Sequence, residues 1–168
     1  NDGSIRLHVD DKIINLHTLC YALEGLLYAY FVTKEYKFLN FIIRALNWCD
    51  NQISSDGSID LWFNSKYHSK SSYPVAQILR LKILVSKIDD SINLKTNSVL
   101  LTFLNSLQSL APSPAVDGSF YEEFYKSMFG WKKRLRANSW ASMFALQAIY
   151  WNDNISQINF EQEIGRAH

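Results

Sequence analysis

Apolar residues recur three and four positions apart along most of the chain, which is the spacing of one face of an α-helix. The clearest stripe begins with Leu16, Leu19 and Leu23 and continues to Tyr30. The pattern predicts five helices, over residues 16–33, 36–52, 73–88, 95–110 and 138–151. Three segments break it and are predicted to be loops: 60–72, 111–119 and 121–137.

A short phrase recurs in step with these helices. Asp-Gly-Ser occurs at residues 2–4, 56–58 and 117–119. Glycine tolerates a positive φ after a helix, and the flanking Asp and Ser can hydrogen-bond to freed backbone groups. The repeat predicts a single all-α domain over residues 1–168, built from about two and a half helical hairpins. Their bounds are 1–55, 56–116 and 117–153, and a tail follows at 154–168.

Composition and charge narrow the function classes. Apolar residues make up 48% of the chain and aromatic residues 14%, which is sufficient for a substantial core and excludes a disordered chain. The formal net charge is only +1, so the chain does not have the excess of basic residues that is typical of a nucleic-acid-binding protein. No run of 18 apolar residues is present, so no membrane-spanning helix is expected. Cys20 and Cys49 fall on predicted helices as small reduced hydrophobes, which favours a cytoplasmic setting.

One cluster of positive charge lies in the third irregular segment. It comprises Lys132, Lys133, Arg134 and Arg136. It is interpreted as a solvated loop, with contact to a phosphate or a carboxylated ligand as the alternative.

Polar and aromatic residues share one face of the three helices that follow the Asp-Gly-Ser phrases. Residues i, i+4 and i+7 of a helix lie on the same side. Aligning the helices gives three matching stripes, which are His17, Tyr21 and Glu24; Tyr73, Gln77 and Arg80; and Trp140, Phe144 and Gln147. This mixture suits a saccharide, because aromatic faces stack on the C–H surface of sugar rings while polar groups bond to hydroxyls or a uronate.

Catalytic roles within this set are assigned by chemistry. Glu24 is the best acid/base candidate, with His17 as its partner. The expected ligand-binding residues are Tyr21, Trp62, Tyr73, Gln77, Arg80, Trp131, Trp140 and Gln147. As alternatives, His17 caps a helix start, Glu24 pairs with a Lys or Arg of a neighbouring helix, and Tyr21 and Phe144 belong to the core.

Neither a metal nor another cofactor is expected. A zinc site needs three converging protein ligands. The histidines at 8, 17, 68 and 168 have no Cys or His partner at helical spacing. Asn138 and Ser139 are expected to cap the fifth helix, and Ser139 has no visible His/Asp partner that would make it a nucleophile.

The stretch Leu46 to Ser58 resembles the helix-end repeat of the α/α-toroid proteins: an apolar helix, Trp48, Gln52, then Asp-Gly-Ser. That superfamily includes six-hairpin glycosidases, polysaccharide lyases and sugar epimerases, as well as terpenoid cyclases and prenyltransferases. The resemblance implies that the chain is part of a larger ring, as a C-terminal fragment. It also implies that the helices after the repeated phrases line a central cavity, which would place the three stripes there.

These features predict a protein that binds an oligosaccharide or uronate, and that hydrolyses, eliminates or epimerises it if it is an enzyme; they leave catalysis open. Cell-surface polysaccharide metabolism is the expected setting. An isoprenoid cyclase or prenyltransferase is one alternative, opposed by the lack of its acidic motifs. A noncatalytic helical-repeat scaffold is another. An incomplete ring would expose apolar hairpin edges, which predicts self-association.

Overall fold

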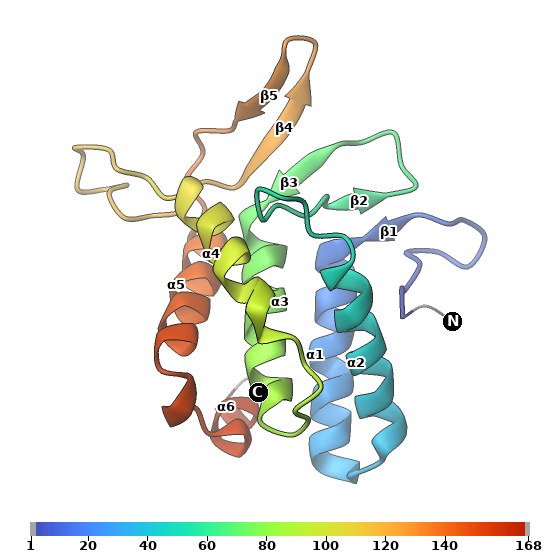
Figure 1. Cartoon of the computed structure of the whole chain (residues 1–168). Coiled ribbons are helices and arrows are strands. Elements are labelled where there is room, and N and C mark those ends of the chain that lie inside the picture. Colours follow the sequence, from blue (N-terminus) through green and yellow to red (C-terminus); the bar gives the residue numbers. More distant parts are fainter. Residues whose placement is uncertain (1–2, 167–168) are drawn as a thin grey trace.

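The computed structural model describes residues 3–166, so Asp2 of the first repeated phrase and His168 lie outside the described residues. Five of its helices correspond to the predicted ones, and Figure 1 labels them. They are α1 (Leu16–Thr33), α2 (Tyr36–Asp50), α3 (Ser72–Ser86), α4 (Asn97–Ser106) and α5 (Ser139–Asp153). The predicted bounds hold to within three residues except at α4.

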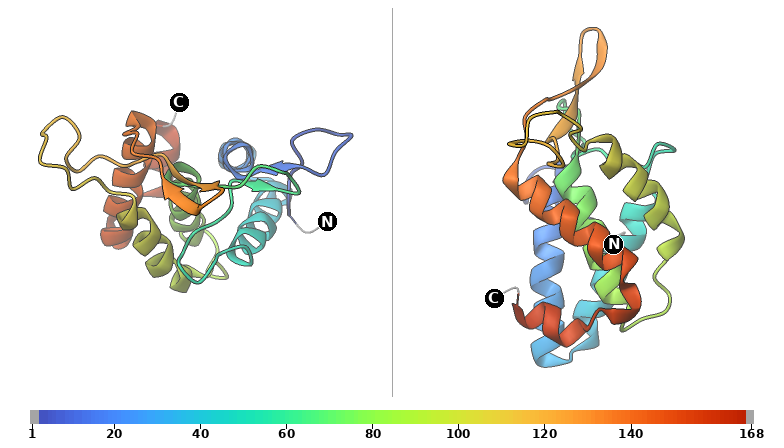
Figure 2. Two further views of the ribbon diagram at one scale, coloured as in Figure 1. Left: turned by 90° about the horizontal axis from the view of Figure 1, so that it is seen from above. Right: turned by 90° about the vertical axis from the view of Figure 1, so that its left-hand side faces the viewer.

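The helices form two layers. Helices α1, α3 and α5 lie in one layer, with α3 packed against both of the others, and α2 and α4 cover them in the second layer (Figure 2, left). Because α3 has neighbours on every side, its central residues from Val75 to Leu79 are fully buried. The helices that follow the repeated phrases therefore lie side by side in one layer.

Asparagine side chains begin two of these helices. Asn15 accepts a hydrogen bond from the Thr18 N–H at 2.9 Å, at the start of α1. Asn138 accepts from the N–H groups of Trp140 and Ala141 at the start of α5, which confirms the cap predicted at Asn138. Each cap satisfies backbone donors that have no partner within their helix.

Helix α4 is shorter than the predicted 95–110. A 3₁₀ turn, η1 (Leu94–Thr96), precedes it, and the chain leaves the helix at Leu107. Gln108 then forms a β-bridge with Phe120. Apolar periodicity continues through this stretch, but pairing with a distant segment replaces the last helical turn.

Two of the predicted loops contain β-strands, so the chain is not purely helical. Strand β1 (Ile14–Asn15) pairs with β2 (Trp62–Phe63). The strands β3 (Ser69–Ser71), β4 (Glu123–Ser127) and β5 (Gly130–Lys133) form an antiparallel sheet in the order β3-β4-β5. Both small sheets lie at the end of the helical layers where α1, α3 and α5 begin (Figure 1).

The predicted tail is also structured. After a second 3₁₀ turn, η2 (Ile155–Gln157), the chain forms the short helix α6 (Phe160–Arg166). Helix α6 packs on α1, where the ring of Phe160 lies 6.0 Å from that of Phe31 and Ile164 is 6% exposed. No helix in the range 3–166 is long and apolar enough to span a membrane.

The glycines of the repeated phrase hold positions that other residues cannot adopt without strain. Gly3 and Gly57 have φ values of +95° and +79°. A Cβ at Gly3 would lie 2.5 Å from the carbonyl of Arg44 in α2, and a Cβ at Gly57 would lie 1.8 Å from the carbonyl oxygen of Val99 in α4. Each glycine thus lets a loop touch the backbone of an outer helix.

Candidate functional site

Polar side chains from α1 and α3 pair across the inner layer. His17 Nδ1 lies 2.7 Å from Gln77 Oε1, and Arg80 Nη1 donates to Glu24 Oε1 at 3.1 Å. Both pairs join residues of the predicted stripes. The structure therefore places these two stripes on facing sides of neighbouring helices.

Aromatic rings surround these pairs. The imidazole of His17 has its centroid 4.4 Å from the ring of Tyr21 and 4.7 Å from the ring of Tyr73. The guanidinium of Arg80 lies 4.9 Å from the ring centroid of Phe144 in α5. Cations are attracted to aromatic faces at such distances. The third stripe thus joins the other two through Phe144.

The centre of this face contains polar atoms that are buried without a partner. Gln77 is fully buried, and the Arg80 side chain is 12% exposed. Gln77 Nε2 and Arg80 Nε have no hydrogen-bond partner among the described residues. Burial lowers the pKa of Arg80, and the charge of Glu24 acts in the opposite direction. Buried donors without a partner are uncommon in native proteins. Gln77, a predicted ligand-binding residue, lines neither of the two pockets on this face, so its amide is not open to a ligand.

A pocket of about 240 Å³ opens where α1, α3 and α5 begin. Trp140 is 58% exposed at this pocket, so its ring face is available to a ligand. The side chains that line it are His17, Tyr73, Glu122, Asn138, Trp140 and Phe144. Three predicted site residues, one from each inner helix, thus meet with a carboxylate that was not predicted.

That carboxylate belongs to Glu122, which sequence reasoning missed. Glu122 directly precedes β4 in a segment without helical periodicity. Its carbonyl oxygen accepts from the Ser72 N–H at 2.9 Å and from the Ser72 hydroxyl at 3.1 Å, which attaches the segment to the start of α3. Its Oε2 is buried without a partner within residues 3–166. Only the pairing of residues 50 positions apart brings this side chain to the pocket.

A second pocket, of about 310 Å³, lies farther along the same helices. Glu24 and Arg80 line its polar side, and Tyr21, which is 40% exposed, lies at its edge. Glu163 and Ile164 of α6 also line this pocket. The predicted tail therefore closes one side of a cavity on the inner face.

The structure bears on the alternatives for individual residues. Glu24 does pair with a basic residue of a neighbouring helix, as one interpretation expected. His17 contacts the side chain of Gln77. Phe144 is 5% exposed and belongs to the core, whereas Tyr21 is partly open to solvent. Gln147 is half-buried on α5 and lines neither pocket.

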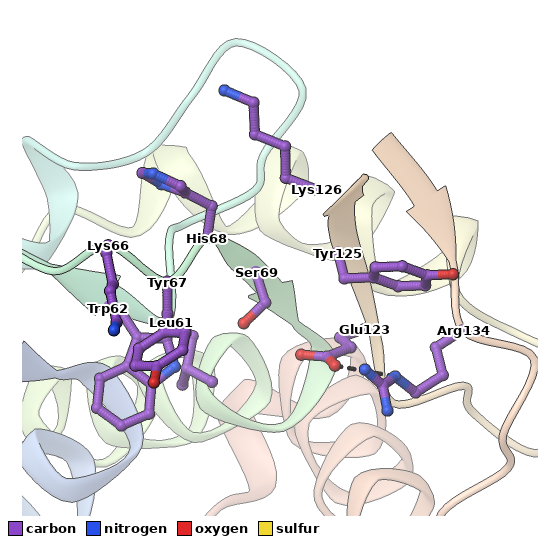
Figure 3. A pocket seen from close by; sticks show the side chains of 10 residues that line it. All are labelled: Leu61, Trp62, Lys66, Tyr67, His68, Ser69, Glu123, Tyr125, Lys126 and Arg134. Carbon is purple, nitrogen blue, oxygen red and sulfur yellow. Dashed lines mark ion pairs between the residues drawn. The ribbon is translucent and has the colours of Figure 1, made fainter. Parts of the chain in front are cut away.

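Trp62 and Trp131 lie apart from this face. Trp62 is half-buried in β2 with its ring 6.2 Å from Tyr67, and it lines a more open pocket of about 520 Å³ between the two small sheets. Figure 3 shows that pocket, with Trp62 and Tyr67 on one side and the ion pair of Glu123 and Arg134 on the other. Trp131 lies in β5, where Lys70 Nζ is 5.0 Å from its ring centroid. Within the described residues, no group of three His, Cys, Asp or Glu side chains could hold a metal ion.

Comparison of the sequence with protein-family models and with curated proteins yields no significant match. Solved structures, however, share its fold. A family 76 glycoside hydrolase from a bovine Bacteroides thetaiotaomicron strain superposes with a TM-score of 0.63 at 15% identity, over 92% of this chain and 35% of that one. An unsaturated glucuronyl hydrolase specific for heparin gives a TM-score of 0.64 at 16% identity, over 89% of this chain and 42% of that one.

A third solved structure is a substituted unsaturated glucuronyl hydrolase from Streptococcus agalactiae, complexed with dGlcA-GalNAc6S. It gives a TM-score of 0.56 at 14% identity, over 89% of this chain and 42% of that one. The chain therefore has the helical fold of the corresponding parts of these structures. It spans less than half the length of each of these three structures.

Proposed function

We propose that the face formed by α1, α3 and α5 binds a saccharide, and that the protein acts on glycosides. The observation that carries this proposal is the pocket where His17, Glu122 and the exposed ring of Trp140 meet. A carboxylate, an imidazole and an open aromatic platform are the groups that a sugar-processing site requires. The fold shared with three glycoside hydrolases supports the proposal.

In this proposal the aromatic residues bind the apolar faces of sugar rings. Trp140 stacks on a ring in the first pocket, and Tyr21 contacts the next ring at the edge of the second pocket. Because indole and phenol rings combine a large apolar face with a polar edge, they suit sugars, which have the same division. Tyr73 and Asn138 complete the polar lining.

The basic side chain at the second pocket favours an acidic sugar. Arg80 lines this pocket, and its Nε has no partner among the described residues, so a carboxylate bound there can accept from the guanidinium. Two of the three similar structures are unsaturated glucuronyl hydrolases, whose substrate carries a uronate. We infer that a uronate or another anionic sugar is the ligand class.

Acid/base chemistry is assigned to Glu24, His17 and Glu122. Glycoside hydrolysis commonly uses two carboxyl groups. Glu122 and His17 line the same pocket, so proton transfer there is assigned to these two side chains. Glu24 lines the second pocket beside Arg80, and acid/base chemistry at that pocket is assigned to it.

A saccharide panel that includes uronate-containing oligosaccharides tests this function. The variants Glu122→Gln, His17→Ala and Glu24→Gln should each lower affinity or turnover for a ligand found with the native chain. Glu35→Gln is the matched control, because Glu35 is exposed at the turn between α1 and α2. If all three variants behave like the control, the proposed site is wrong.

A further inference from the structure

The β4–β5 hairpin ends in an apolar tip. Its turn consists of Met128 and Phe129, whose side chains are 96% and 86% exposed. Ser127 holds the turn, because its hydroxyl donates to the Gly130 carbonyl oxygen at 2.7 Å and accepts from the Phe129 N–H at 3.2 Å. The hairpin projects beyond the helices (Figure 1; Figure 2, right). The fold therefore presents two apolar side chains at its outermost point.

Basic residues flank this tip. Residues 123–136 contain five basic residues and one acidic residue, Glu123, which is paired with Arg134 at 3.0 Å near the base of the hairpin. Lys126 and Lys132 are exposed on the two strands next to the tip, and Trp131 lies directly opposite Lys126 with 44% of its surface exposed. The positive charge is thus concentrated just behind the apolar turn.

We propose that this hairpin binds the surface of a membrane that contains anionic lipids, with Met128 and Phe129 inserted among the lipids. Exposed apolar groups mark interaction sites, and a convex apolar tip backed by lysines matches the acyl boundary and headgroup layer of a bilayer. In this arrangement Trp131 lies at the membrane–water interface, where tryptophan is enriched in membrane proteins.

A polyanionic saccharide is a weaker match for the same surface. Lysines would attract it, but Met128 and Phe129 carry no polar atom that could bond to its hydroxyl groups. A sugar site is also concave, whereas this tip is the end of a projecting turn. The apolar pair therefore favours lipid over saccharide.

Co-sedimentation with vesicles tests the proposal. The native chain should bind equimolar phosphatidylcholine and phosphatidylserine vesicles and should bind pure phosphatidylcholine vesicles much less. Met128→Ser together with Phe129→Ser should lower the partition coefficient at least about tenfold. Lys126→Gln together with Lys132→Gln should lower it about fivefold per lysine and weaken its salt dependence.

Matched controls distinguish binding through the hairpin from nonspecific binding through any exposed apolar side chain or any exposed lysine. Leu110→Ser removes an apolar side chain that is 87% exposed elsewhere, and Lys87→Gln with Lys95→Gln removes two exposed lysines in the connection between α3 and α4. Both should bind vesicles like the native chain. The proposal is overturned if the native chain does not bind acidic vesicles, or if the variant with both Met128 and Phe129 replaced binds them as strongly as the native chain does. Loss of heparin binding in the lysine variant, with unchanged vesicle binding, would also overturn it and assign the hairpin to a soluble polyanion.

Discussion

The ion pair of Glu24 and Arg80 makes a quantitative prediction about the inner face. Replacing Glu24 with Gln removes the negative charge next to a guanidinium whose side chain is 12% exposed. A fully buried cation left without its partner costs about 3–5 kcal/mol, whereas an exposed pair contributes about 0.2–1 kcal/mol. Because the Glu24 side chain is 30% exposed, we expect a loss of about 1.5 kcal/mol.

Replacing Arg80 with Met completes a double-mutant cycle. Methionine retains much of the apolar contact with Phe144 and Trp151, and Glu24 is open enough to be hydrated, so this change should cost about 1 kcal/mol or less. In the double variant no buried cation is left unpaired. Its loss should therefore be smaller than the sum of the two single losses by about 1 kcal/mol or more.

Urea unfolding followed by circular dichroism measures the free energy of unfolding of the native chain, the two single variants and the double variant. For a domain of this size, a loss of 1 kcal/mol also lowers Tm by about 2–4 °C, which gives an independent check. Additive losses, within about 0.3–0.5 kcal/mol, would refute the reasoning, because they would show that the two side chains do not interact across the inner face.

Three further predictions concern the core and the loops. Asp50→Asn should lower the free energy of unfolding by about 3 kcal/mol, because Lys82, which is 0% exposed, loses the carboxylate 2.6 Å away. The difference in unfolding free energy between this variant and the native chain should shrink as the pH rises toward the ordinary lysine pKa of about 10.4. Burial lowers the pKa of Lys82, so its neutral form, which needs no carboxylate partner, becomes accessible. A difference that does not depend on pH would contradict this. Gly57→Ala should lower the free energy of unfolding, measured by thermal denaturation, by about 3 kcal/mol or more, since its Cβ would overlap the Val99 carbonyl oxygen. A loss below about 1 kcal/mol would argue against this close contact. Burial raises the pKa of Cys49 to about 12, so its thiol should react with a disulfide reagent only after unfolding, and rapid labelling of the folded protein would be inconsistent with its place in the core.

Helices and their shared face were predictable because both depend on local spacing. The stripe of Leu16, Leu19 and Leu23 requires only the 3.6-residue repeat, and the same arithmetic places His17, Tyr21 and Glu24 on one side of α1. The pairing partner of Glu24 was predictable only as a basic residue of a neighbouring helix. Which residue it would be depended on how α1 and α3 pack.

The strands and Glu122 could not be predicted in this way. Strand β3 has three residues and pairs with β4, more than 50 positions away, so no local pattern marks either strand. Glu122 reaches the pocket because its carbonyl bonds to Ser72, which is a tertiary contact. The only signal in the sequence was the long irregular segment 121–137, which is rich in aromatic residues. That segment indicated a binding loop but did not identify Glu122 as the residue that reaches the pocket.

The direct test of the saccharide site is the change in affinity for one uronate-containing oligosaccharide when Trp140, rather than Trp131, is replaced by Ala. Isothermal titration with both variants compares two exposed indoles, one in the pocket with His17 and Glu122 and one on the β4–β5 hairpin. The account predicts that Trp140→Ala raises Kd about two- to tenfold, since an aromatic contact contributes about 0.5–1.5 kcal/mol, and that Trp131→Ala leaves Kd unchanged. Equal effects of the two changes, or an effect of Trp131→Ala alone, would contradict a saccharide site on the face of α1, α3 and α5.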